Sequence, residues 1–414
     1  MGPIALFDKS FLQSLNLDEA VWFDQFYEPN IPPLFYVETL ADLDKEISRG
    51  RTAEQVVGEI ASKTPELSGA PNVHHLDLLL ANLMGQHISM DKRPIVAGGR
   101  FVESGGKKGV NLDVSPEAKA FARWQNREYL QIEREFASNW RARLKLMTFE
   151  SSATYTKELG IDIQQCKNID DAYAVANQIV SERRKPYELI EFIISAFEIS
   201  REYHQELVPR YQNANFPSLI DYAPYAAYVT KVEIFFHISV LRSFISADRP
   251  SNKVDVAYLY YLPFCNVFIS GDKLHKNITP LFLGKGQQFI WGPDLKADLT
   301  KLNEHFMALP EDIRDKGIIS FANRPPIEGD FLTASLWDMI SSTWRTGIKN
   351  IVPLNDQIND ELVKHIKGFT EAPTLPFEKT PIAEAQTDSM CIQRSISKKR
   401  GSWYQLPKNF KNSV

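Results

Sequence analysis

Residues 255–276 read DVAYLYYLPFCNVFISGDKLHK, and this stretch decides the expected fold. Its pattern predicts a short helix that opens at Asp255, a break at Pro263 and a buried strand over 266–269. A Ser-Gly-Asp sequence follows, which places a second acid at Asp272. Open parallel sheets bind ligands at the carboxyl ends of their strands. Two acids on this helix and strand therefore suggest metal chemistry at one edge of a sheet.

The beginning of the chain repeats this arrangement. Residues 4–7 are an apolar run that ends directly in Asp8, which predicts a buried strand with an acid at its tip. Residues 34–36 predict a second short strand, with Glu38 in the first turn of the helix after it. The carboxyl ends of parallel strands and the N-termini of the following helices share one sheet edge. We therefore expect four carboxylates to converge: Asp8, Glu38, Asp255 and Asp272.

A cleft that holds several carboxylates favours a cation. Like charges raise each other's pKa unless a positive charge neutralises them. Mg²⁺ and Mn²⁺ prefer oxygen ligands and keep several waters, so a mixed carboxylate site suits them. No cluster of cysteine and histidine offers a competing zinc site, because the three cysteines are far apart in the sequence.

Composition excludes several classes of protein. A net charge of −5 argues against coating nucleic acid through bulk positive charge, although a local basic groove stays open. Widely spaced cysteines indicate a reducing compartment. The chain begins without a signal-peptide pattern, and no apolar run reaches the ~20 residues of a membrane span. A cytoplasmic protein without a membrane partner is therefore expected.

At 414 residues the chain can hold two domains, or one domain with a large insertion. We expect the sheet to be built from two separate parts, 1–48 and 251–308. The intervening 49–250 predicts a mostly helical insertion with a glycine-rich hairpin near 94–110. Beyond the second part, 309–370 predicts a helical extension, and 371–414 a flexible tail with a basic end. Within the insertion we expect one long helix over 115–147 and another over 188–210.

Taken together, the acid-bearing motifs resemble PIN domains, a superfamily of metal-dependent nucleases related to flap endonucleases. The resemblance rests on four segments: Phe-Asp-Lys-Ser-Phe-Leu at 7–12, Leu-Phe-Tyr-Val-Glu-Thr-Leu at 34–40, the stretch 255–272, and a final strand within 289–293. It implies a PIN-like three-layer α/β fold with a short parallel central sheet. The insertion departs from the small size of a typical PIN domain, and Asp248 competes with Asp255 for the third acidic position.

The resemblance also implies an activity. Asp8, Glu38, Asp255 and Asp272 would hold one or two Mg²⁺ or Mn²⁺ ions, with Ser10 and Ser270 in support. The metal would activate a water molecule for phosphodiester hydrolysis and leave a 5′-phosphate and a 3′-hydroxyl. RNA is favoured over DNA as the substrate. A toxin or defence effector is an expectation from fold-level analogy.

Five basic residues are candidates for contact with the substrate backbone: Lys273, Lys276, Arg100, Lys107 and Lys108. The first two follow Asp272 closely, and the other three belong to the expected glycine-rich hairpin. The alternative is that all five are ordinary surface charges and that the hairpin is solvated.

Each acid also has a structural interpretation. Asp8 can cap a helix, Asp272 can form a turn, and Glu38 and Asp255 can lie on solvated helix faces. A non-catalytic PIN-like scaffold is the corresponding alternative function; its helical insertion would bind nucleic acid, a protein partner or a second copy of the chain. A metallophosphoesterase that acts on a small nucleotide is the other alternative, and it requires an enclosed pocket. Convergence of the four carboxylates distinguishes the catalytic hypothesis from the scaffold.

Overall fold

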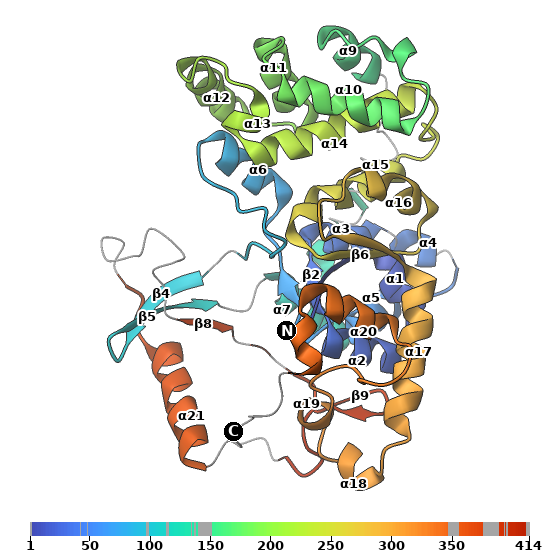
Figure 1. Cartoon of the computed structure of the whole chain (residues 1–414), viewed down its shortest axis with the longest axis vertical. Helices are drawn as coiled ribbons and strands as arrows, with labels where there is room; N and C mark the ends of the chain where they lie inside the picture. Colours follow the sequence, from blue (N-terminus) through green and yellow to red (C-terminus); the bar gives the residue numbers. More distant parts are fainter. Residues whose placement is uncertain are drawn as a thin grey trace.

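The structure is a computed structural model of the chain, and it describes residues 2–41, 43–47, 49–96, 99–112, 116–133, 135, 138–139, 151–346, 356–375, 389–392, 394 and 396–410. A parallel sheet with helices on both faces forms its centre. Figure 1 shows a helical region above this sheet and a strand hairpin beside it. The expected α/β class with a parallel central sheet is confirmed.

The central sheet has the strand order β3-β2-β1-β6-β7, and every neighbouring pair is parallel. Its strands are β1 (Ile4–Phe7), β2 (Glu28–Ile31), β3 (Ala70–Pro71), β6 (Val267–Ser270) and β7 (Gln288–Trp291). The strands at the centre are buried on both faces and apolar except for Ser270, as expected for a sheet covered on both sides. Leu6 pairs with Phe268 and Phe7 pairs with Ile269, so the two halves of the sheet come from opposite ends of the sequence.

One face of the sheet is covered by helices that flank the strands in sequence. Phe7 and Ile269 point to this face and join a single apolar cluster. The main helices of the cluster include α1 (Lys9–Ser14), α2 (Leu17–Phe26), α5 (Ala53–Lys63), α7 (Pro116–Gln125) and α17 (Gly292–Met307). Asn16 and Thr52 each form a capping box, which fixes where α2 and α5 begin.

The other face is covered by the helical region. Leu6 and Phe268 point to this side and belong to a second apolar cluster. Helix α14 (Pro224–Leu241) lies at its centre and is buried around almost its whole circumference. The remaining helices of this region are α6 (His75–Leu83), α9 (Ser151–Glu158), α10 (Ile169–Ser181), α11 (Pro186–Ala196), α12 (Arg201–Asn213) and α13 (Leu219–Tyr222).

The chain returns to the sheet through α15 (Ser251–Ala257) and the 3₁₀ segment η2 (Tyr258–Phe264). Strand β6 leads into α16 (Lys273–Ile278) and η3 (Thr279–Leu281). The extension after α17 contains α18 (Glu311–Arg314), α19 (Ile318–Phe321), α20 (Leu332–Ile340), η4 (Ser342–Arg345) and α21 (Asp356–Glu371). Of these, α20 packs against α17 and so belongs with the sheet-bearing part.

Several expected boundaries differ from the structure. The segment 34–36 is not a strand, because it lies within α3 (Pro33–Ala41), and the second strand is β2. Asp255 does not open a helix, since α15 begins at Ser251. The first helix within the expected range 115–147 ends at Gln125, and residues 140–147 of that range lie outside the described residues. The helix expected over 188–210 is divided into α11 and α12.

The boundary expected at residue 49 is also wrong. Helix α5 packs against the sheet, and β3 pairs with β2. Residues 53–71 therefore belong to the sheet-bearing part, and the helical region begins after β3. A short helix, α4 (Leu43–Ile47), connects α3 to this segment and contacts α5.

The glycine-rich segment forms the expected hairpin. Strands β4 (Gly99–Ser104) and β5 (Lys107–Leu112) are antiparallel, with Gly105 and Gly106 at positive φ in the turn. Strand β8 (Ser389–Ile392) pairs with β5, and α21 packs against β4. The hairpin is thus joined to the C-terminal part of the chain.

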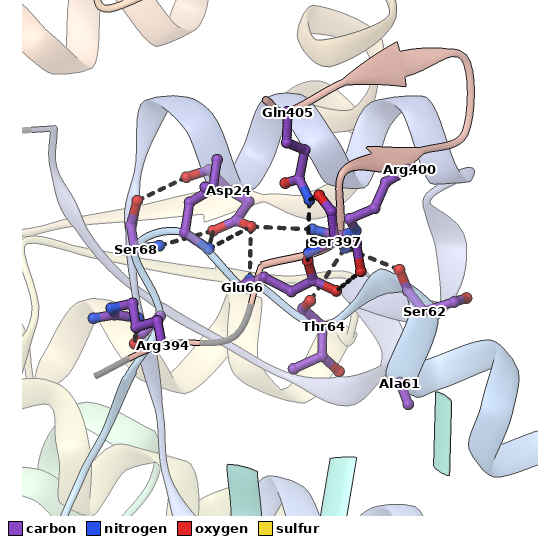
Figure 2. A network of polar contacts seen from close by, with 12 residues as sticks. Asp24, Ala61, Ser62, Thr64, Glu66, Ser68, Arg394, Ser397, Arg400 and Gln405 are labelled. Atoms are coloured by element: carbon purple, nitrogen blue, oxygen red, sulfur yellow. Dashed lines mark hydrogen bonds and ion pairs between the residues drawn. The ribbon is translucent and has the colours of Figure 1, made fainter. Parts of the chain in front are cut away.

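The expectation of a flexible tail does not hold for its last described segment. Strands β9 (Lys399–Arg400) and β10 (Trp403–Tyr404) form a small hairpin, and Trp403 is only 1% exposed beside Trp22. Figure 2 shows Arg400 reaching the carboxylate of Asp24, at an Nη1–Oδ2 distance of 3.0 Å. The tail therefore anchors to α2 through a buried ion pair and an aromatic contact.

Candidate functional site

The site lies where the order of the sheet reverses. Strand β1 has β2 on one side and β6 on the other, so the chain leaves β1 in one direction and returns on its opposite side. Open parallel sheets bind ligands outside the carboxyl ends of the strands at such a switch point. Asp8 follows β1 and Asp272 follows β6, so both acids occupy this edge.

Asp8 is held in place by several donors. Its Oδ1 accepts a hydrogen bond from the Phe11 amide at 2.8 Å, which caps α1. Its Oδ2 accepts from Ser10 Oγ at 2.8 Å and from Ser270 Oγ at 2.6 Å. Burial alone would raise the pKa of Asp8, but His275, Ser270 and the Phe11 amide together hold this pKa below its usual value. Asp8 is therefore a buried, ionised carboxylate.

His275 connects the two strand ends. Its place beside Asp272 in the sequence predicts a contact with the substrate backbone or a surface charge, but the residue is buried, at 1% exposed. Its Nδ1 lies 2.7 Å from Ser270 Oγ and 3.5 Å from Asp8 Oδ2. Its Nε2 lies 2.7 Å from the backbone oxygen of Asp255. Burial lowers the pKa of His275, but the hydrogen bond and charge of Asp8 outweigh burial and raise it to about 9. The ring is thus an imidazolium that donates from both nitrogens.

Asp272 caps α16 and remains open to solvent on one side. Its Oδ1 accepts from the Leu274 amide at 2.6 Å, and its own amide donates to Ser270 Oγ at 2.9 Å. A Cβ on Gly292 would lie 3.1 Å from the Gly271 nitrogen, so a glycine there lets β7 and α17 approach this strand end closely. Ser270 thus links Asp272, Asp8 and His275 in one network.

Glu38 reaches the site from α3 and not from a strand end. Its Oε2 accepts a hydrogen bond from the Tyr258 hydroxyl at 2.5 Å. Lys9 is 2% exposed; its Nζ donates to the backbone oxygen of Glu38 at 3.2 Å and lies 3.9 Å from Oε1. Glu38 therefore has both a hydroxyl and a cation beside it.

Asp255 is the least compensated of the four acids. Among the residues that the structure describes, none forms a hydrogen bond or ion pair with its carboxyl oxygens. Burial is the largest influence on the pKa of Asp255. The charge of His275 lowers this pKa, but burial and the negative charges of Glu38, Asp272 and Asp8 outweigh it and raise the pKa to about 7. These charges show that the four acids share one electrostatic environment. The assignment of Asp255 to the acidic site stays a prediction, and its position within α15 differs from the expected helix start.

The carboxylates of the site suit a divalent cation that keeps most of its water ligands. No three histidine, cysteine, aspartate or glutamate side chains within the described ranges lie close enough together to hold a metal ion directly. Mg²⁺ commonly uses one or two carboxylates and fills its other positions with water. Asp255, whose pKa is raised, and Asp272, beside exposed Gly271 and Lys273, fit such a hydrated ion.

The basic candidates divide into two groups. Lys273 and Lys276 are exposed on α16, next to the acids, and Lys276 Nζ lies 4.7 Å from the centre of the Trp291 ring. Arg100 donates to the backbone oxygens of Thr370 and Ala372 at 2.8 Å each, so it helps to fasten α21. Lys107 and Lys108 lie on β5, which Figure 1 places well away from α16. The structure brings only the two α16 lysines to the acid cluster.

Comparisons with known proteins add no family to this description. No family model matches the chain, and neither a curated protein nor a solved structure does. In the part of the chain that the structure describes, no helix is both long enough and apolar enough to cross a membrane.

Proposed function

We propose that the protein is a divalent-metal-dependent phosphodiesterase, a nuclease of PIN-like type. The observation that carries the proposal is the position of Asp8 and Asp272 at the switch point of a parallel sheet. Glu38 and Asp255 lie near enough that the other three charges, together with burial, raise the pKa of Asp255 to about 7. An excess of carboxylates at a ligand-binding edge is the electrostatic condition that a bound cation relieves.

The residues have distinct roles in this proposal. Asp255 and Asp272 would contact the metal or its waters, because their carboxyl oxygens are the most available. Asp8 would supply fixed negative charge, since Ser10, Ser270 and His275 already surround it. A bound Mg²⁺ or Mn²⁺ ion supplies an activated water and offsets charge on the phosphate.

The substrate would approach over α16. Lys273 and Lys276 are exposed beside Asp272 and suit contact with phosphate oxygens. Gly271 is exposed at the same edge, which favours a polymer laid across an open surface over a small nucleotide enclosed in a pocket. The preference for RNA over DNA rests on the resemblance to PIN domains alone.

A second candidate function is a non-catalytic PIN-like scaffold. The observation that favours it is the presence of two buried cations, Lys9 and His275, inside the acid cluster. Lys9 lies beside Glu38, and His275 lies beside Asp8. In a scaffold these side chains would do what a metal does in an enzyme, namely neutralise the carboxylates.

A cleavage assay tests the proposal. The protein would be incubated with single-stranded and structured RNA and DNA in Mg²⁺, Mn²⁺ or EDTA, beside its Asp8→Asn, Asp255→Asn and Asp272→Asn variants. Asp312→Asn is the matched control, because Asp312 is an exposed acid on α18, which Figure 1 places far from α16. We expect metal-dependent cleavage by the wild type and by Asp312→Asn only.

Two results would contradict the nuclease proposal. One is cleavage that persists in EDTA, and the other is full activity in both Asp255→Asn and Asp272→Asn. Binding of nucleic acid without cleavage in any metal would support the scaffold instead. Circular dichroism of each variant shows whether a loss of activity follows from loss of the fold.

A further inference from the structure

The helical region inserts one acidic side chain into the wall of the site. Glu233 lies near the middle of α14, and its side chain is 1% exposed. Its Oε1 forms an ion pair with Lys253 of α15, and its Oε2 accepts a hydrogen bond from the Tyr260 hydroxyl at 2.5 Å. Both partners belong to the segment 251–264, which also carries Asp255.

This segment presents two sets of side chains to two neighbours. Lys253 and Tyr260 are seven positions apart, which places them on one side of a helical segment. Asp255 and Tyr258 are three positions apart, so they lie together on a different side of the same segment. Tyr258 donates to Glu38, and the Asp255 backbone accepts from His275. One set thus binds the helical region and the other set faces the acid cluster.

Other groups around Glu233 strengthen this contact. Lys253 Nζ also lies 5.0 Å from the centre of the Phe236 ring on α14. His237 Nε2 lies 3.1 Å from Oε1 of Glu233, although the geometry does not make a hydrogen bond. His237 itself is fixed by Ser152 Oγ, 2.8 Å from its Nδ1. The ring of His75 lies 4.8 Å from that of Tyr260, so α6 packs on the same segment.

Burying an ion pair usually contributes little to stability, because both charges lose their hydration. An apolar pair of similar volume would fill the space between α14 and α15 as well. What the ion pair adds is a fixed register, since Glu233 accepts from two residues of segment 251–264 at once. Glu233 therefore restrains both the translation of segment 251–264 along its axis and its rotation about that axis.

We propose that Glu233 is a positioning residue, through which the helical region sets the location of Asp255 and Tyr258 at the acid cluster. This inference rests on the proposed function in assigning a metal-binding role to Asp255. In this inference the helical insertion acts without contacting substrate, because it positions the segment that carries Asp255.

The test compares Glu233→Gln with Asp24→Asn. Asp24 is a matched control, because it forms a similarly buried ion pair, with Arg400, at the C-terminal hairpin and outside the acid cluster. Mn²⁺ binding would be measured by electron paramagnetic resonance at a temperature where circular dichroism shows both variants folded. Hydrogen exchange would be followed in peptides that cover 251–264 and 273–278.

We expect Glu233→Gln to weaken Mn²⁺ binding by about tenfold, the scale seen when outer-shell partners of metal ligands are removed. Asp24→Asn should bind Mn²⁺ as the wild type does. Exchange should rise in 251–264 and 273–278 for Glu233→Gln, and only near the C-terminal hairpin for Asp24→Asn.

Equal Mn²⁺ affinity in wild type and Glu233→Gln would overturn the inference, whatever the exchange shows. If the wild type binds no Mn²⁺, the proposed function fails and hydrogen exchange decides the positioning role alone. Faster exchange in 273–278 would then support the positioning role of Glu233, because the contact of His275 with Asp255 couples this helix to segment 251–264. Unchanged exchange there would overturn it.

Discussion

The imidazole of His275 donates through Nε2 to the backbone oxygen of Asp255 at 2.7 Å, and this bond joins α16 to α15. Through Nδ1 the same ring lies 2.7 Å from Ser270 Oγ, which in turn lies 2.6 Å from Asp8 Oδ2. One charged ring thus connects both acid-bearing strand ends with the returning helix. Three segments distant in sequence meet at this residue.

The charge on His275 predicts a pH dependence of stability. Its folded pKa of about 9 lies above the ordinary value of 6.5, so the folded state binds the proton more tightly. The resulting stability is fully present below about pH 6.5 and is lost as the pH rises through about 9. We expect the metal-free wild type to lose about 3 kcal/mol of unfolding free energy across this range.

Urea denaturation at pH 6.5 and pH 9.5 measures this loss. His275→Gln should show a flatter pH dependence, because glutamine does not titrate, and it should be less stable than the wild type at pH 6.5. Parallel pH profiles for the wild type and the variant would show that folding does not raise the pKa of His275.

The raised pKa of Asp255 predicts that removal of its charge increases the free energy of unfolding. Its pKa of about 7 against an ordinary 3.8 means that Asp255 contributes stability at low pH that is lost as the pH rises through about 7. At pH 8, without metal, Asp255→Asn should therefore be more stable than the wild type, by about 2 kcal/mol after allowance for partial exposure. At pH 4 the two proteins should be nearly equal.

Mn²⁺ should reverse this order, because only the wild type would gain binding free energy from the metal. Thermal unfolding at pH 8, with and without Mn²⁺, provides the measurement. An Asp255→Asn variant that is destabilised at pH 8 without metal would mean that the carboxyl group has a partner in solution and is not under strain.

Ser270 and Ser10 provide a matched pair of substitutions. Both hydroxyls lie within hydrogen-bond distance of Asp8 Oδ2, but Ser270 is completely buried and Ser10 is exposed. Ser270→Ala leaves buried groups of Asp8, His275 and Asp272 without their shared partner, which costs about 2 kcal/mol. In Ser10→Ala water replaces the hydroxyl, so we expect a loss of about 0.5 kcal/mol or less. Urea denaturation at pH 7 compares them, and equal losses would contradict the assignment of Ser270 as the centre of the network.

Part of this site could be predicted from sequence because its signals are local. Asp8 and Asp272 each follow a buried apolar strand and cap the next helix, so neighbouring residues determine their positions. Their shared sheet edge then follows from parallel pairing. The hairpin at Gly105 and Gly106 is equally local, since the turn requires positive φ.

The features that local patterns do not predict depend on contacts between residues distant in sequence. Strand β2 contains Pro29 and Asn30, which local patterns disfavour, and it is stabilised by Asn30 Nδ2 donating to the Phe264 backbone at 2.9 Å. The apolar run after Pro33 predicts a strand, but proline at the first helical position favours the helix α3 that the structure has. The buried role of His275 has no local signal, because it comes from Asp8 and Asp255, which only the folded chain brings to this residue.

The last prediction concerns the C-terminal hairpin and its ion pair with α2 (Figure 2). Asp24 accepts from the amides of 66–68 as well as from Arg400, whose Nη2 donates to the backbone oxygens of Ser62 and Thr64. Asp24→Asn leaves the Arg400 charge buried without its counter-ion, so we expect a loss of about 3–5 kcal/mol of unfolding free energy. Arg400→Met should cost a similar amount, because it leaves the carboxylate of Asp24 buried.

The double variant should lose less than the sum of the two single losses, because the second substitution removes the charge that the first left unpaired. Thermal unfolding of all four proteins gives this coupling, and limited proteolysis shows whether 396–410 has detached. Additive losses would mean that Asp24 is held by the amides of 66–68 alone. In that case burial of Trp403 against Trp22, and not the ion pair, would be what fastens the hairpin to α2.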